Sequence, residues 1–169
     1  AERTSLPIFA SVASIDATEI LRGAKALAKI AEHVIVAVPL VEDALPAVRR
    51  LATDGVRVAA TLVHSVAQGL LAAKAGAWCV SPFIGRLDDV SSDGMALIRQ
   101  IVTIYKNYDY KTQVLVASVR HPQHVVEAAL AGGHICTMPY AVFQQLVKHP
   151  LTDSGLKKFL ADWDAMGKK

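Results

Sequence analysis

Two arginines and a serine stand where apolar segments of this chain end. Arg86 follows one such segment, and Ser118 and Arg120 lie at the end of another. A guanidinium group binds a phosphate dianion through two parallel hydrogen bonds, and a serine hydroxyl can donate a further one. These residues therefore indicate an anion site, with a surface ion pair to Asp88 or Asp89 as the alternative.

The histidines and cysteines give weaker signals. His64 follows an apolar run and could act as an acid or base, although a solvated loop histidine is the simpler interpretation. His121 and His124 have the spacing of one helical turn, but the sequence offers no third metal ligand beside them. Cys79 and Cys136 lie inside apolar runs, which indicates buried thiols in a reducing compartment rather than nucleophiles or a disulfide. We expect neither a metal nor a cofactor.

Six short apolar runs alternate with amphipathic helix patterns along the chain. Runs of this kind, without polar alternation, are typical of parallel strands that are covered on both faces. In parallel α/β folds, ligands bind at the carboxyl ends of the strands, which is where the arginines, the serine and His64 stand. The predicted strands are residues 6–13, 33–40, 56–63, 78–85, 113–120 and 134–138.

Helix signals separate these strands and follow the last one. Asp16 and Glu19 have the spacing of a capping box, and Pro122 suits the first position of a helix. Ser91 or Ser92 is the expected cap of the longest internal helix. The predicted helices span residues 16–31, 42–54, 65–75, 91–108, 122–130, 140–148 and 154–166, the last following a break at Pro150. The final helix carries an apolar stripe that either packs on its own barrel or reaches a neighbouring subunit.

Two parallel architectures fit this repeat of strands and helices. A doubly wound sheet requires a glycine-rich phosphate turn after its first strand, and residues 12–16 contain no glycine. A TIM-type barrel places phosphate ligands after its late strands, and Arg120 closes the penultimate predicted strand. We therefore predict one α/β domain over residues 1–169. It is a TIM-type barrel of six βα units plus a C-terminal helix, and it is incomplete because eight units close such a barrel.

Length and charge exclude several classes of protein. The chain has 169 residues, of which 53% are hydrophobic, and a net charge of +3. No apolar run reaches the roughly 18 residues of a membrane span, and the charge is too small to indicate nucleic-acid binding. We expect a cytoplasmic protein that contacts neither membrane nor nucleic acid.

Three segments carry a resemblance to a known family. Residues 72–89 (AAKAGAWCVSPFIGRLDD), residues 118–124 (SVRHPQH) and residues 148–163 resemble the small bacterial transaldolases and fructose-6-phosphate aldolases. The similarity extends from about residue 6 to residue 163. In this comparison the first predicted strand corresponds to the family's third strand, so the first two βα units of the family barrel are absent.

The resemblance implies a Schiff base between a lysine on the family's fourth strand and a ketose phosphate. Residues 36–39 match that strand, and Ala37 stands at the lysine position. A methyl group cannot attack a carbonyl. Ser11 matches a glutamate or glutamine that polarises water, Ala59 an asparagine, and Phe83 a tyrosine of some aldolases. The catalytic positions implied by the resemblance are Ser11, Ala37, Ala59, Thr61 and Phe83.

The resemblance also implies a substrate site that is retained. Its members are Ser81, Arg86, Ser118 and Arg120, which are expected to hold a sugar phosphate or a phosphate or sulfate anion. Family members suggest a homo-oligomer assembled through the terminal helix. Three functions remain open at this point. The chain binds a sugar phosphate without carbon–carbon bond chemistry, or it is an assembly module that completes a barrel with a partner chain carrying the missing units, or it is an active aldolase or transaldolase that obtains an amine from elsewhere.

Overall fold

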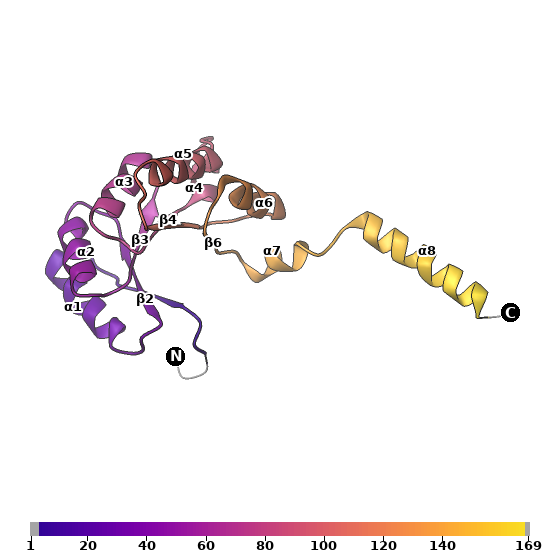
Figure 1. Ribbon diagram of the computed structural model, residues 1–169, viewed down its shortest axis with the longest axis horizontal. Helices are drawn as coiled ribbons and strands as arrows, with labels where there is room; N and C mark the ends of the chain where they lie inside the picture. Colours follow the sequence, from indigo (N-terminus) through magenta and orange to yellow (C-terminus); the bar gives the residue numbers. More distant parts are fainter. Residues whose placement is uncertain (1–3, 168–169) are drawn as a thin grey trace.

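The computed structural model describes residues 4–167 and contains six parallel strands curled into a half-barrel (Figure 1). The strands pair in chain order, and the helices that connect them lie on the convex outer side of the arc. This arrangement confirms the prediction of an incomplete TIM-type α/β barrel. The ends of the predicted domain, residues 1–3 and 168–169, lie outside the described range. The strands are β1 (Ile8–Ser11), β2 (Val34–Pro39), β3 (Val58–Val63), β4 (Cys79–Pro82), β5 (Gln113–Val116) and β6 (Ile135–Cys136).

Local capping chemistry fixes where several helices begin. The Asp16 carboxylate accepts a hydrogen bond from the backbone N–H of Glu19 at 2.9 Å, and Ser65 and Gln68 form a reciprocal capping box. No helix within residues 4–167 is long and apolar enough to cross a membrane. The helices are α1 (Ala17–Ala28), α2 (Ala44–Thr53), α3 (Val66–Lys74), α4 (Ile84–Asp88), α5 (Gly94–Asn107), α6 (Pro122–Ala131), α7 (Tyr140–Gln145) and α8 (Pro150–Met166).

Alternation along the strands divides the apolar side chains between two layers. On β2, Val34, Val36 and Val38 belong to the large cluster that packs against the outer helices. Ile35 and Ala37 point to the other side and join a small cluster on the concave face. The members of that cluster are Ile35, Ala37, Ala59, Cys79, Leu115 and Ala117. Because three of its six residues are alanines, the concave face is not filled.

Strand register places three of the predicted catalytic positions at one level. Ser11 pairs with Ala37, and Ala37 pairs with Ala59, across β1, β2 and β3. Paired residues of parallel strands point to the same face of a sheet. The three side chains therefore form one row on the concave face.

The predicted strand 78–85 is wrong at its C-terminal end. β4 stops at Pro82, and the chain turns at once into the short helix α4, which the sequence analysis missed. Arg86 consequently lies on a helix instead of at the end of a strand. Phe83 still contacts the sheet through an isolated bridge to Ala117.

The predicted strand 113–120 is also too long. β5 ends at Val116, and Ser118 has a φ of 61°, in the left-handed region, outside the extended conformation of a regular strand. Ser118 and Arg120 therefore lie in the loop between β5 and α6. This loop faces α4, so the two segments that carry the predicted anion ligands meet at the same end of the strands.

Two helix starts differ from the prediction. Asp93, not Ser91 or Ser92, caps α5, and its carboxylate accepts a hydrogen bond from the N–H of Ala96 at 2.8 Å. Pro150 is the first residue of α8 instead of a break before it, because proline is tolerated at that position.

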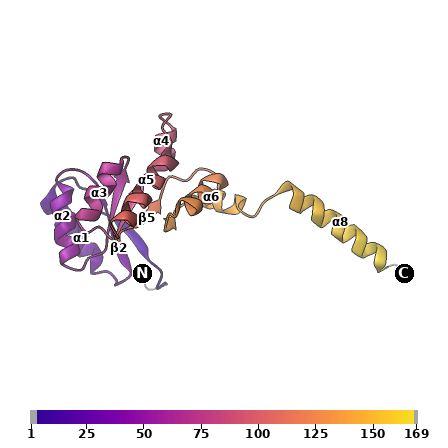
Figure 2. The same cartoon turned by 45° about the horizontal axis from the view of Figure 1, so that its top comes forward.

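The terminal helix α8 extends away from the half-barrel in both views (Figures 1 and 2). None of its described residues is buried, and Phe159 and Trp163 are more than half exposed. Of the two alternatives left open for its apolar stripe, packing on its own barrel is therefore not what the structure shows. The expectation that both faces of every strand are covered also fails at β1, where the edge residue Phe9 is exposed.

Candidate functional site

A cavity of about 400 Å³ opens on the concave face of the half-barrel. All six strands contribute side chains to it. The lining contains every predicted catalytic position together with Ser81, so the fold brings these six residues to one place. The lining residues are Phe9, Ser11, Ala37, Ala59, Thr61, Ser81, Phe83, Leu115, Ala117, Ile135, Cys136 and Thr137.

The floor of this cavity carries no reactive nitrogen. Ala37 and Ala59 are buried side by side in β2 and β3, and their methyl groups neither donate, accept nor attack. Within residues 4–167, the cavity lining includes no lysine. The position that the family resemblance assigns to a Schiff-base lysine is therefore a methyl group that faces open space.

Hydroxyl groups make up the polar part of the lining. They come from Ser11, Thr61, Ser81 and Thr137, and none has a protein hydrogen-bond partner within the described residues. A hydroxyl both donates and accepts, so each can serve a sugar hydroxyl or carbonyl. Thr61 reaches the cavity beside a bulge, where Leu62 has a φ of 58° and the register between β3 and β4 shifts.

Arg120 stands at the rim with one edge of its guanidinium occupied. Its Nη2 donates to the carbonyl of Gly85 at 3.2 Å and to Oδ2 of Asp89 at 2.6 Å. The surface ion pair that the sequence offered as an alternative is thus present, with Asp89 as the partner. Over residues 4–167, Nε and Nη1 have no such partner. Because Nε lies close to Gly85, Nη1 is the nitrogen that can still donate to an anion.

Close packing holds the predicted anion ligands on adjoining segments. A Cβ added to Gly85 would lie 2.3 Å from the carbonyl oxygen of Ser118 and 2.7 Å from Nε of Arg120. The loop after β5 is therefore pressed against the start of α4, one residue before the exposed Arg86. Arg86, Ser118 and Arg120 lie at the same end of the half-barrel, as predicted.

The rim adjoins the cavity. Ser118, Val119 and Arg120 line a shallow hollow together with Thr137, and Thr137 also lines the cavity. One ligand could therefore place a charged group against the arginine loop and an uncharged body over the row of alanines. His64 lies at the same end, with its ring edge against Phe83 at 6.1 Å between centroids.

His124 connects the two rim segments, a role that sequence reasoning missed. Its Nδ1 accepts a hydrogen bond from the backbone N–H of Arg120 at 3.3 Å, and its Nε2 lies 3.2 Å from Oδ2 of Asp88. Burial and then the neighbouring ring of His121, whose centroid lies 3.7 Å away, lower the pKa of His124 below its usual 6.5, although Asp88 and Glu127 act in the opposite direction. The lowered pKa favours the neutral form of this ring beside Asp88.

From the sequence, His121 and His124 were considered only as possible metal ligands. Within residues 4–167, no group of three or more His, Cys, Asp or Glu side chains is arranged to hold a metal ion. The signal that could have shown the observed role is the proline between the two histidines, which marks a helix start with His121 as its cap.

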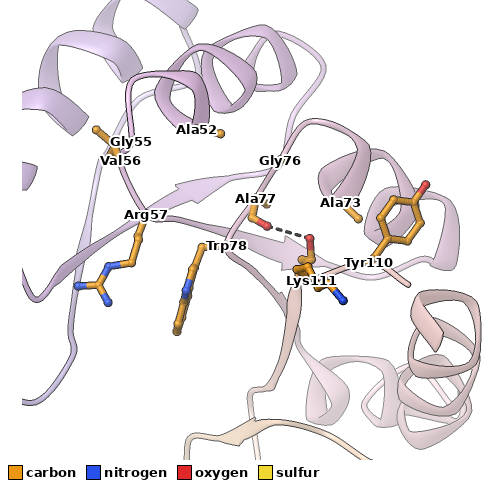
Figure 3. Close-up of a pocket in the computed structure, with 11 residues that line it drawn as sticks. Ala52, Gly55, Val56, Arg57, Ala73, Gly76, Ala77, Trp78, Tyr110 and Lys111 are labelled. Carbon is orange, nitrogen blue, oxygen red and sulfur yellow. Dashed lines mark hydrogen bonds between the residues drawn. The ribbon is translucent and has the colours of Figure 1, made fainter. Parts of the chain in front are cut away.

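A second hollow of about 400 Å³ lies at the opposite ends of the strands (Figure 3). It is formed by the loops that precede β3, β4 and β5. Arg57 lies over the ring of Trp78 at 5.8 Å and donates to the carbonyl of Glu32 at 2.6 Å, and Lys111 is paired with Asp109 at 2.8 Å. Because this hollow lies at the other end of the sheet, its lysine does not serve the concave cavity.

The two cysteines are thiols at neutral pH. Burial raises the pKa of Cys79 to about 12 and also raises the pKa of Cys136. Cys79 is fully buried, as predicted, whereas Cys136 is half-buried because it lines the cavity. Neither is activated as a nucleophile.

The sequence matches known proteins over almost its whole length. A family model described as Transaldolase/Fructose-6-phosphate aldolase matches residues 3–169. A probable transaldolase of Prosthecochloris aestuarii is 59% identical over 162 residues, which cover 96% of this chain and 73% of that protein. A probable transaldolase of Anaeromyxobacter sp. (strain Fw109-5) is 56% identical over 163 residues, which cover 96% of this chain and 76% of that protein. With the half-barrel fold and a match of this extent, the chain belongs to the transaldolase/fructose-6-phosphate aldolase family.

Proposed function

We propose that this chain binds a sugar phosphate at the carboxyl ends of its strands without forming a Schiff base. The observation that carries the proposal is that Thr137 lines both the concave cavity and the hollow formed by the arginine loop. The sugar lies among the four cavity hydroxyls, and the phosphate lies against Ser118 and Arg120 with Arg86 nearby.

Charge supports this orientation of the ligand. The twelve lining residues of the cavity include no charged side chain, whereas Arg120 lines the hollow at the rim and the exposed Arg86 lies on the adjoining helix α4. A dianion loses less hydration at the open rim than in the cavity, and charge-assisted hydrogen bonds from arginine are among the strong ones. Asp89 neutralises part of the Arg120 charge, which makes the expected affinity moderate.

The floor of the cavity argues against native carbon–carbon bond chemistry. Schiff-base catalysis needs a primary amine with a lowered pKa beside the substrate carbonyl. Ala37 supplies no amine, Ala59 supplies no amide, and Phe83 has no hydroxyl proton to give. What the site retains is binding.

Calorimetric titration tests the binding claim. Fructose 6-phosphate, dihydroxyacetone phosphate and inorganic phosphate serve as ligands. Arg120→Gln should weaken each by at least about tenfold, since a hydrogen bond between charged groups is lost. Arg99→Gln is the matched control, because Arg99 pairs with Asp93 at the start of the outer helix α5. No binding to the unmodified chain, or equal losses in both variants, contradicts the proposal.

Borohydride trapping tests the absence of imine chemistry. Incubation with dihydroxyacetone phosphate and borohydride should leave the mass of the chain unchanged. A trapped adduct, followed by measurable cleavage of fructose 6-phosphate, would instead support an active aldolase that draws its amine from another residue.

A second candidate function is assembly, favoured by the open edges of the sheet. β1 and β6 each have one neighbouring strand, and such edges pair readily with another chain. The exposed apolar residues of α8 add a surface of the same kind. In this case the chain completes a barrel with a partner chain or a copy of itself. Light scattering after size exclusion separates the two functions, because a folded monomer that binds phosphate tightly contradicts assembly.

A further inference from the structure

The loop after β5 is joined to α4 by contacts on both sides of Ser118. On one side, the backbone N–H of Ile84 donates to the carbonyl of Ala117 at 3.0 Å. On the other side, Arg120 donates to the Gly85 carbonyl and pairs with Asp89. Ser118 itself has a φ of 61°, a conformation that an L-residue adopts only when its surroundings hold it there. The shape of the rim thus depends on what fixes this loop.

One contact in this network joins the backbone of the loop to α6, the helix that follows it. His121 caps α6, and its Nδ1 accepts a hydrogen bond from the backbone N–H of His124 at 3.4 Å. His124 in turn accepts from the backbone N–H of Arg120. This is a capping box shifted by one residue, made by two imidazole rings. It fixes the backbone at Arg120, two residues after the strained Ser118.

We infer that His124 is a positioning residue of the anion site. Its Nδ1 accepts from the backbone N–H of Arg120 and its Nε2 lies 3.2 Å from Oδ2 of Asp88, so it holds the arginine loop beside α4 in the arrangement that presents Ser118, Arg120 and Arg86 to one ligand. The inference rests on the proposed function, because it assigns a role within the same site.

The neutral state of the ring is what the geometry requires. An imidazolium has no acceptor, so a proton on Nδ1 would remove the hydrogen bond from Arg120. The groups that face the ring are Asp88 from α4, His121 and Glu127 from α6, and Arg120 from the loop. His124 is only 8% exposed, and this burial favours the neutral form.

Two substitutions separate the hydrogen bond at Nδ1 from the contact at Nε2. In His124→Asn, the amide oxygen can stand at the place of Nδ1 and accept from Arg120, while the contact with Asp88 is lost. In His124→Gln, the longer amide can donate to Asp88, while the acceptor for Arg120 is lost. Sulfate is the probe, because it stays a dianion over the working pH range and thus adds no titration of its own.

The positioning role predicts unequal losses of sulfate affinity. His124→Asn should bind sulfate like the unmodified chain, and His124→Gln should bind roughly three- to tenfold more weakly, the effect of one lost hydrogen bond. His149→Gln is the matched control, since His149 caps α8 through Nδ1 in the same way but far from the rim. Equal affinities in all variants, or equal losses in both His124 variants, overturn the inference.

A spectroscopic measurement on the unmodified chain keeps the inference testable if a variant fails to fold. The ¹⁵N shifts of the His124 ring at pH 7.5 should show a bare Nδ1 and a protonated Nε2. A ring protonated on Nδ1 overturns the inference. The ring can have the expected tautomer while the unmodified chain does not bind sulfate. In that case the proposed function fails and the positioning role fails with it, but the hydrogen bond between Arg120 and His124 is still supported.

Discussion

Gly85 is the position where a single methyl group should disturb the rim most. A Cβ there would lie 2.3 Å from the carbonyl oxygen of Ser118, whereas real contacts of this kind do not fall below 3.0 Å. The obstacle is backbone, so it cannot rotate away as a flexible side chain can. In Gly85→Ala the loop after β5 and the start of α4 must therefore separate by roughly 0.7 Å or more.

The size of the effect follows from the cost of overpacking. Forcing a methyl group into a closely packed site costs about 1–3 kcal/mol. In a chain of this length, each kcal/mol lowers the melting temperature by about 2–4 °C, so we expect a fall of about 2–12 °C. Because the displaced segments carry Ser118 and Arg120, phosphate affinity should fall as well, by about tenfold if one charge-assisted hydrogen bond is lost.

Thermal unfolding followed by circular dichroism, together with phosphate titration, measures both effects. The matched control is Gly155→Ala on α8, where a Cβ meets no atom within 4 Å and the backbone is helical. Alanine favours a helix over glycine by up to about 1 kcal/mol, so this control should not lower the melting temperature. If Gly85→Ala melts within about 1 °C of the unmodified chain and binds phosphate equally well, the close packing of the rim is refuted.

Three further predictions address the floor, the rim and the buried thiol. Ala37→Lys should give a borohydride-trapped adduct with dihydroxyacetone phosphate that the unmodified chain lacks, because burial in the cavity lowers the pKa of a lysine and leaves it a free amine; an unchanged mass contradicts the position assigned to the lysine. Asp89→Asn should strengthen phosphate binding by roughly two- to fivefold, as an exposed carboxylate that competes for Arg120 is removed; weaker binding in the titration would show that Asp89 orients Arg120 instead. Cys79 should stay unreactive toward a chromogenic disulfide at pH 8 until the chain unfolds, measured in a Cys136→Ser background, because burial raises its pKa to about 12. This shift also makes the stability of the chain depend on pH. Because the pKa of the thiol is higher in the folded chain, the free energy of unfolding should fall as the pH rises above about 9, where the thiol of the unfolded chain begins to lose its proton.

The strands and their order could be predicted because their pattern is local. β2 shows this well, since its apolar run is continuous and both of its faces are buried. Ala37 could be assigned to the cavity because residues 36–39 resemble a family strand, and the register with Ser11 and Ala59 then places all three in one row. The roles of these residues stay predictions, since their positions do not test chemistry.

The rim could not be predicted in detail because it depends on contacts between distant segments. Serine has no strong preference for positive φ, so nothing in residues 113–120 shows that the strand ends before Ser118. The contact between His124 and Asp88 joins residues 36 positions apart, and sequence spacing gives no sign of it. The exposed stripe of α8 was ambiguous for a similar reason, because an amphipathic pattern shows that a face needs a partner but not where the partner lies.

The two halves of the site differ in what holds them, and this difference bears on the proposal of binding without Schiff-base chemistry. At the floor, Ala37 and Ala59 contribute only side chains, and β2 and β3 pair through their backbones whatever those side chains are. At the rim, Gly85 and the carbonyl of Ser118 touch through the backbone itself, so no larger residue fits at position 85 without moving the loop. A methyl group can therefore replace a reactive side chain at the floor while the arginine loop keeps its shape. If Ala37→Lys restores a trapped adduct while phosphate affinity stays unchanged, the two halves are separable in the way the packing implies.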